Sequence, residues 1–372
     1  MPTISNETFP IVCVSGKPRE RGAEHGRLLR DRIALAVDRY MERFAHFSGL
    51  DRPAARREAL RYTDPIRAYD PEILEEIEGV AEGAGLPFED LLAMNCRSEL
   101  MFGSAVIMEC SSFALQPSVT EDGHTYVGQN WDWAPDIVET LAIVAIQQEP
   151  DKPDVILLDE AGIVGRMGFN SSGIALCTNT LIADQERPDG VPYNVLLRGV
   201  LNSRRLDDAI AALIRPPRAI CSNYVIGDAG GQTMDVEVAP EQFDYVTPYN
   251  GIITHGNHFA GPRMKVHDRS VEKWPDSLYR ECRIRALLEP HAPDIRVEHM
   301  MDALRDRFGH PHAVSRHADP EQGRFDQLQT VASLIVDCED RECWIAAGPP
   351  DGTDYTHYEM ADLFAASSGA EA

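Results

Sequence analysis

The chain has 372 residues, a formal net charge of −25 at pH 7 and a hydrophobic fraction of 43%. This length supports one large domain or two ordinary ones with a sizeable core. The negative charge argues against nucleic acid, whose binding requires lysine and arginine at the phosphates, and against anionic membrane surfaces. No apolar run approaches the roughly 20 residues that span a bilayer, and no signal-peptide pattern opens the chain. We therefore expect a cytoplasmic protein.

The hydrophobic spacing predicts strands in the interior of the chain and helices in groups at both ends and in the middle. A strand at 9–14 is followed by predicted helices at 19–47, 71–84 and 88–96. Further predicted strands are 113–115, 125–129, 141–147, 155–158, 163–168, 174–178, 219–226, 232–238, 251–254, 331–336 and 343–346, and further helices 193–202, 206–213, 277–288 and 297–307. The regular strand–helix alternation of a parallel doubly wound sheet is absent. This grouping favours an α+β fold with helices on both faces of two stacked sheets.

Cys110 stands out because of its sequence context. It opens the run Cys110-Ser-Ser-Phe, and eighteen residues later comes the run Gly128-Gln-Asn-Trp-Asp-Trp. If the chain is cut between Glu109 and Cys110, the cysteine gains a free α-amine beside its thiol. An α-amine titrates at about 7.7–8.0 and a thiol at about 8.5, so one residue would hold nucleophile and base near neutral pH.

These runs resemble the acyl-coenzyme A:6-aminopenicillanate acyltransferase family, also called peptidase family C45, of N-terminal-nucleophile hydrolases. Three more stretches match in the family's order: Gly165-Arg-Met-Gly-Phe-Asn-Ser-Ser-Gly, Thr254-His-Gly-Asn-His-Phe and Ser315-Arg-His. The resemblance implies a four-layer αββα sandwich formed by a single domain, residues 1–372. It also implies self-cleavage into an α chain, 1–109, and a β chain, 110–372. The two fragments would form a heterodimer, which can assemble further into a homo-oligomer.

Four residues are candidates for the chemistry. Cys110 is the nucleophile, with a buried structural cysteine as the alternative. Asp132, in a block rich in tryptophan, holds the α-ammonium or orders a loop through charge-assisted hydrogen bonds, with a structural turn aspartate as its alternative. Asn257 matches the oxyanion-hole asparagine, for which a turn residue is the structural alternative. Arg316 anchors a substrate carboxylate or orients Cys110, with a surface ion pair as its alternative.

Three further residues are predicted to line the substrate site. Trp131 and Trp133 suit pocket walls or core positions rather than catalysis. Asn170 corresponds in place to an asparagine that helps form the site of related bile-salt hydrolases, and a turn residue is the alternative. Glu109 stands where family members often have glycine, a departure that bears on the rate of self-cleavage.

No metal or cofactor is expected. His255 and His258, and the group His310, His312 and His317, are conceivable ligands, but no paired cysteine or carboxylate motif accompanies them. Glycine-rich phosphate loops are also absent from the sequence.

The leading hypothesis is a self-processing N-terminal-cysteine amidohydrolase or acyltransferase that forms a thioester on Cys110. By analogy its substrate is a small linear N-acyl amide, with an acyl-coenzyme A or an amine as co-substrate in the case of transfer. One alternative is an uncleaved thiol hydrolase of the papain type, in which His258 is the base. The other is a family member without activity that serves as a binding protein.

Overall fold

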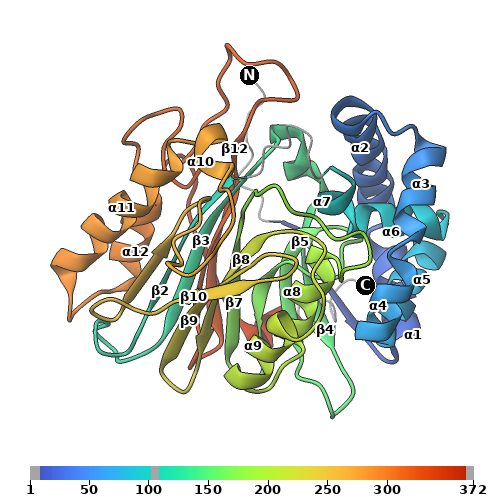
Figure 1. Cartoon of the computed structure of the whole chain (residues 1–372). Helices are drawn as coiled ribbons and strands as arrows, with labels where there is room; N and C mark the ends of the chain where they lie inside the picture. The colour runs from blue at the N-terminus through green and yellow to red at the C-terminus, as the bar shows by residue number, and fades with distance from the viewer. Residues whose placement is uncertain (1–8, 102–108, 366–372) are drawn as a thin grey trace.

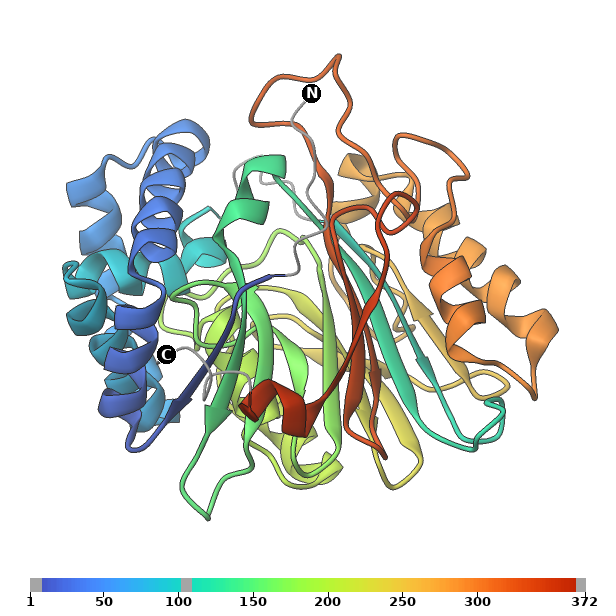
Figure 2. The same cartoon turned by 180° about the vertical axis from the view of Figure 1, so that it is seen from behind.

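The computed structural model of the protein describes residues 9–101 and 109–365. Within these ranges two β-sheets lie face to face, with helices on their outer sides (Figure 1). Sheet A has the strand order β1-β4-β5-β6-β7-β8-β9-β10, and sheet B the order β11-β2-β3-β12-β13-β14. At the edge of sheet A, β1 pairs with β4 in parallel (Figure 2).

The strands are short, and most of them are almost wholly buried. Sheet A comprises β1 (Ile11–Ser15), β4 (Leu141–Gln147), β5 (Val155–Glu160), β6 (Met167–Asn170), β7 (Ile174–Thr180), β8 (Ser222–Asp228), β9 (Gln232–Val238) and β10 (Phe243–Val246). Sheet B comprises β11 (Ile252–His255), β2 (Glu109–Leu115), β3 (Tyr126–Trp133), β12 (Gln329–Asp337), β13 (Glu342–Ala347) and β14 (Thr356–Glu359). Every residue of β2 and β3 is buried, because these strands have sheet A on one face and helices on the other.

Four layers follow from the contacts between elements. In the middle, β2 and β3 of sheet B touch β7 and β8 of sheet A. On the outer face of sheet A lie α8 (Tyr193–Leu201) and α9 (Leu206–Ile214), and on that of sheet B lie α11 (Ser277–Leu288) and α12 (Val297–Leu304). The order helix, sheet, sheet, helix is that of an αββα sandwich, and it confirms the predicted α+β class.

The N-terminal helices form a group beside sheet A, at the right of Figure 1. They are α1 (Pro18–Leu28), α2 (Arg30–Ser48), α3 (Arg52–Leu60), α4 (Thr63–Tyr69), α5 (Pro71–Ala84), α6 (Phe88–Asn95) and α7 (Arg97–Leu100). The short elements elsewhere are η1 (Pro135–Thr140), α10 (Ser270–Lys273), η2 (Glu289–His291) and α13 (Met360–Ala365).

Several predicted boundaries differ from the structure, for example the strand expected at 219–226, which is Ser222–Asp228, and the helix expected at 297–307, which ends at Leu304. Two other differences have identifiable reasons. The single helix expected at 19–47 is divided at Leu29 into α1 and α2. Gly26 lies so close to α5 that an added Cβ would stand 2.2 Å from the carbonyl oxygen of Val80. This close contact holds α1 against α5, whereas α2 also packs on η1. The strand expected at 163–168 begins only at Met167, because Gly165 belongs to a loop that packs against the backbone of α8.

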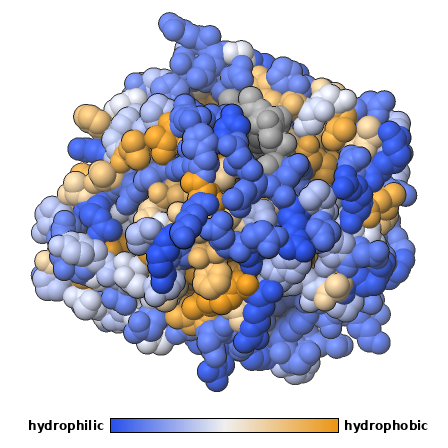
Figure 3. Space-filling model, in the orientation of Figure 1, coloured by the Kyte–Doolittle hydropathy of each residue, from blue (hydrophilic) through white to orange (hydrophobic). Residues whose placement is uncertain are grey.

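The visible surface is mostly hydrophilic, with smaller hydrophobic areas between the charged groups (Figure 3). Among the helices that the structure describes, none combines the length and the apolar character needed to cross a bilayer.

Candidate active site

Cys110 is fully buried near the start of β2. Its partner across the β2–β3 ladder is Trp131, so the two side chains lie on the same face of sheet B. Burial raises the pKa of the Cys110 thiol to about 11, against the lowering effects of the Arg166 guanidinium and of a hydrogen bond with Gln129. In the continuous chain the thiol is therefore protonated at neutral pH and requires a base to become a nucleophile.

Asn257 binds the backbone nitrogen of Cys110. The Cys110 N–H donates to Asn257 Oδ1 at 2.8 Å, and Arg280 Nη2 donates to the same oxygen at 3.1 Å. Asn257 Nδ2 donates to the carbonyl oxygen of Thr180 at 3.1 Å. Two donors on one side and a carbonyl on the other fix the orientation of the amide. Cleavage before Cys110 would turn the contacted nitrogen into the α-amine, whereas the oxyanion role of Asn257 stays a prediction.

Glu109, the residue before Cys110, lies between two buried arginines. Its Oε2 accepts from Arg280 Nη2 at 2.6 Å and from Arg316 Nη2 at 2.7 Å. Asp276 Oδ2 accepts from Arg280 Nε at 2.8 Å and also from Arg316 Nη2. The four side chains form one network, in which two cations are shared by two carboxyl groups.

Arg280 also contacts the backbone on the other side of the predicted cleavage point. Its Nη1 donates to the carbonyl oxygen of Cys110 at 2.7 Å and to Ser111 Oγ at 2.6 Å. One guanidinium thereby holds the residues on both sides of the Glu109–Cys110 bond. Sequence reasoning missed Arg280, because it is one of four charged residues of α11 and no spacing singles it out.

Asp132 faces Glu109 across the β2–β3 ladder. Its Oδ1 accepts from Thr330 Oγ1 at 2.7 Å, and its Oδ2 lies 3.6 Å from Arg316 Nε. Burial raises the pKa of Asp132 to about 6, although Arg316 and Arg280 lower it. The predicted residues Cys110, Asp132, Asn257 and Arg316 are thus brought together in one buried cluster, although up to 206 positions of sequence separate them.

The three predicted substrate-binding residues lie in different environments. Trp131 shares the face of Cys110, and the Arg166 guanidinium lies 4.4 Å from its ring centroid. Trp133 Nε1 donates to the hydroxyl of Tyr40 on α2 at 3.0 Å. Asn170 donates to the carbonyl oxygens of Leu201 and Ser203 and accepts from the backbone of the β6–β7 turn, so its amide is fully engaged within the fold. A substrate role for these residues stays a prediction.

Neither histidine near Asn257 shows a hydrogen bond to Cys110 among the described residues. The His258 ring contacts Ser277 Oγ at 2.8 Å and Glu281 Oε2 at 3.1 Å. The His255 ring contacts Glu237 Oε1 at 2.9 Å, and although burial opposes it, the carboxylates of Asp235 and Glu237 raise its pKa to about 10. An imidazole that is charged at neutral pH cannot act as a base, so His255 is no candidate for that role.

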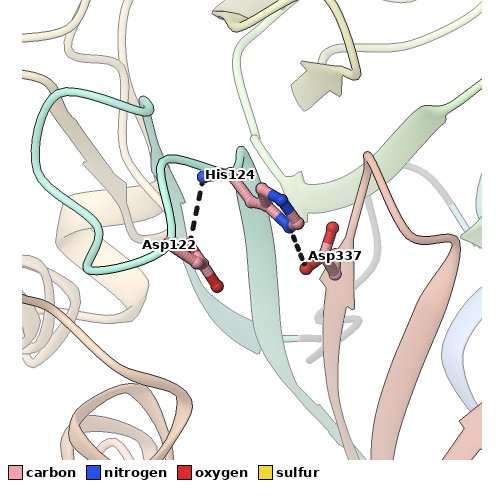
Figure 4. A group of neighbouring side chains, drawn as sticks. All are labelled: Asp122, His124 and Asp337. Carbon is pink, nitrogen blue, oxygen red and sulfur yellow. Dashed lines mark hydrogen bonds and ion pairs between the residues drawn. The ribbon is translucent and has the colours of Figure 1, made fainter.

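One group of side chains in the described part of the chain has the spacing of metal ligands (Figure 4). His124 Nδ1 contacts Asp337 Oδ2 at 2.9 Å, and the backbone N–H of His124 donates to Asp122 at 3.0 Å. Tyr126 donates its hydroxyl proton to the other oxygen of Asp122. These contacts account for the group, and we assign no ion to it. The group lies beside the first residue of β3, whereas Trp131 lies near the other end of that strand.

The network around Glu109 predicts a pH-dependent stability. Burial and Asp276 raise the pKa of Glu109 to about 8, although Arg316 and Arg280 lower it. An unfolded glutamate titrates at about 4.3. The contribution of Glu109 is therefore full below that value and is lost as the pH rises through the folded pKa, by about 1.4 kcal/mol per pH unit within this window.

The measurement is denaturant unfolding of Cys110→Ala and of Cys110→Ala/Glu109→Gln over this pH range, since the first change keeps both chains continuous. We expect the stability of the single variant relative to the double variant to fall toward alkaline pH. A difference that stays constant or grows would contradict the raised pKa.

Comparison with known sequences agrees with the family that the motifs resemble. A family model described as acyl-coenzyme A:6-aminopenicillanic acid acyl-transferase matches residues 119–351, more than half of the chain. The acyl-coenzyme A:6-aminopenicillanic-acid-acyltransferase 40 kDa form of Emericella nidulans is 27% identical over 350 residues, which cover 93% of this chain and 94% of that protein.

Two solved structures are similar at lower identity. Penicillin V acylase from Agrobacterium tumefaciens has 14% identity and a TM-score of 0.43 over 68% of this chain and 88% of that one. A mutant form of the conjugated bile acid hydrolase from Clostridium perfringens has 13% identity and a TM-score of 0.42 over 67% and 96%. Because the family model matches more than half of its length, the chain belongs to the acyl-coenzyme A:6-aminopenicillanic acid acyltransferase family and is an enzyme of acyl transfer or amide hydrolysis.

Proposed function

We propose that the protein is a self-processing N-terminal-cysteine enzyme that hydrolyses or transfers the acyl group of a small linear N-acyl amide. The observation that carries this proposal is the set of contacts to the two residues joined by the Glu109–Cys110 bond. Asn257 accepts a hydrogen bond from the nitrogen of Cys110, Arg280 donates to the carbonyl oxygen of Cys110, and Arg280 and Arg316 donate to the side chain of Glu109. These contacts converge where cleavage would create the nucleophile.

Self-cleavage would begin with attack of the Cys110 sulfur on the carbonyl carbon of Glu109. The carbon–nitrogen bond breaks as the sulfur–carbon bond forms, and the thiol proton passes to the leaving amine of Cys110. Water then hydrolyses the resulting thioester of Glu109 and restores the thiol. The products are the fragments 1–109 and 110–372, which we propose remain associated because β2 lies between β11 and β3 inside sheet B.

Turnover would reuse the same groups. The α-amine of Cys110 takes the thiol proton, the sulfur attacks the substrate carbonyl, and the amine returns the proton to the leaving group. Asn257 Oδ1 already stands at hydrogen-bond distance from this nitrogen and would orient it. Water resolves the thioester in hydrolysis, and an amine resolves it in transfer. The name of the Emericella protein includes acyl-coenzyme A, which makes an acyl-coenzyme A a reasonable acyl donor to test here.

The cytoplasmic location that the sequence predicts belongs to this proposal. All eight cysteines are free thiols, which suits a reducing compartment.

The proposal is tested by trapping the thioester. Wild-type protein is mixed with N-acyl amides and acyl-coenzyme A of graded chain length, quenched in acid, digested and analysed by mass spectrometry. We expect a hydroxylamine-sensitive acyl adduct on the peptide that begins at Cys110, absent from Cys110→Ala and retained in Cys343→Ala, which changes another buried cysteine of sheet B. An adduct on a different residue, or undiminished turnover by Cys110→Ala, would refute it.

A further inference from the structure

Arg166 is a fully buried cation whose donors are only partly used. Its guanidinium stacks on the ring of Trp131, with the guanidinium carbon 4.4 Å from the centroid, and its Nη1 donates to the hydroxyl of Tyr193 at 3.0 Å. Its Nε and Nη2 have no hydrogen-bond partner. Buried guanidinium N–H groups without acceptors are costly, so their presence points to an acceptor that binds there.

The other buried arginines of the described chain are all compensated. Six of them pair with a carboxylate, in the case of Arg280 and Arg316 that of Asp276: Arg21, Arg43, Arg97, Arg198, Arg280 and Arg316. Arg218 has no carboxylate but donates to five backbone carbonyl oxygens. Among the described residues, Arg166 alone of the buried arginines has neither a carboxylate within ion-pair distance nor a set of carbonyls. Burial raises the pKa of the neighbouring Asp159 to about 8, so that carboxyl does not neutralise it at pH 7.

The two unused nitrogens lie on one edge of the guanidinium. Nε and Nη2 are the pair through which an arginine binds both oxygens of a carboxylate side-on. Arg56 uses this edge for the two oxygens of Asp90, at 2.7 and 2.8 Å, and Arg283 uses it for those of Asp306, at 2.9 and 2.7 Å. Arg166 presents the same fork with nothing bound to it.

The fork is held close to Cys110. Trp131, which supports the guanidinium, is the cross-strand partner of Cys110. Gly165 allows the loop that carries Arg166 to pack closely against α8, since a Cβ at this position would lie 2.3 Å from the carbonyl oxygen of Asn194 on that helix. The positive charge of Arg166 is also the largest favourable influence on the thiolate of Cys110.

We infer that Arg166 binds a carboxylate of the substrate beside the carbonyl that Cys110 attacks, so that the preferred N-acyl amides are anionic. This inference rests on the proposed function for the identity of the nucleophile. The carboxylate can belong to the acyl group or to the amine, and the chemistry that Arg166 recognises is the same in both cases. Arg166 is thus a residue that determines specificity.

The test uses two matched substrate pairs. N-glutaryl and N-pentanoyl amides differ by a carboxylate on the acyl side, and N-acylglycine and N-acylglycinamide differ by one on the amine side. We expect wild type to prefer the carboxylate in one pair by about tenfold or more in kcat/KM, as for a charged hydrogen-bonded contact. Arg166→Gln should abolish this preference, because it lowers kcat/KM more for the carboxylate member of the pair than for the neutral one, and Tyr193→Phe, which keeps the charge, should retain the preference.

Equal loss on charged and neutral substrates in Arg166→Gln would overturn the inference, because Arg166 would then act on Cys110 alone. So would a wild-type preference for the neutral member of both pairs. Calorimetric titration of wild type and Arg166→Gln with glutarate provides a readout that needs no turnover. Binding lost in the variant supports the carboxylate site even if the thioester test fails, and equal glutarate binding by both proteins, or none by either, counts against it.

Discussion

Arg280→Met is expected to lower the free energy of unfolding by about 3–5 kcal/mol, because it removes one partner of a buried charge network. Glu109 and Asp276 would lose their shared contact with Arg280, and the carbonyl oxygen of Cys110 would lose its donor. Methionine fills much of the same volume, so the cost comes from charge rather than from a cavity. The measurement is denaturant unfolding in the Cys110→Ala background, where every chain stays continuous.

Arg283→Met is the matched control for this prediction. Arg283 lies one turn further along α11 and pairs with Asp306, but about a third of its side chain is exposed. Exposed pairs contribute about 0–1 kcal/mol, so this change should cost little. Equal losses in the two variants would show that the buried network gives no special stability. With Cys110 restored, Arg280→Met should also slow self-cleavage, since the Glu109–Cys110 bond loses the side chain that contacts both of its residues.

Asn257→Ala is expected to reduce both self-cleavage and turnover by about 10²–10³-fold, the range found when a preorganised polar contact at a reacting centre is removed. The change takes away the acceptor of the Cys110 nitrogen and leaves Arg280 Nη2 without one of its acceptors. The measurements are the rate of appearance of the two fragments and the kcat/KM of the matured enzyme.

Asn170→Ala is the comparison for Asn257→Ala, because it shows the effect of losing an asparagine whose role is structural. All four hydrogen bonds of the Asn170 side chain are made within the fold, so its loss should lower stability and leave the rate per folded molecule nearly unchanged. If Asn257→Ala behaves in the same way, its predicted role in catalysis is wrong. If Asn170→Ala instead raises KM strongly, its predicted role in substrate binding is supported.

Much of the fold could be predicted because its strands are short apolar runs bounded by turn residues. The stacking of two sheets followed from helices grouped on either side of a strand-rich interior, and the structure confirms it. The division of α1 from α2 could not be predicted, since the helical spacing of apolar residues continues through Leu29. The close packing of Gly26 against α5, which fixes the position of α1, is a tertiary contact that the sequence does not show. The separate helices α3 and α4 also carry no strong periodic signal in residues 52–69.

The candidate site could likewise be predicted only in part. Cys110, Asp132, Asn257 and Arg316 lie in recognisable motifs, and the fold brings them together. Arg280 lies outside every such motif, and its importance comes from what it touches on distant strands.

Arg166 shows a different limit of prediction from the sequence. It stands within a stretch that matches the family, yet no spacing reveals that its charge lacks a partner. Partnership of a buried charge is a property of packing, so only the structure could single it out.

The most direct test of the central claim is the denatured intact mass of purified wild-type protein beside Cys110→Ala. Cleavage before Cys110 divides the 41.3 kDa chain into fragments of 109 and 263 residues, about 12 and 29 kDa in proportion to their lengths. We expect these two masses in wild type only, with Cys110 as the first residue of the larger fragment. A single uncut and fully active 41.3 kDa species in wild type would contradict the proposed N-terminal nucleophile and favour an internal thiol instead.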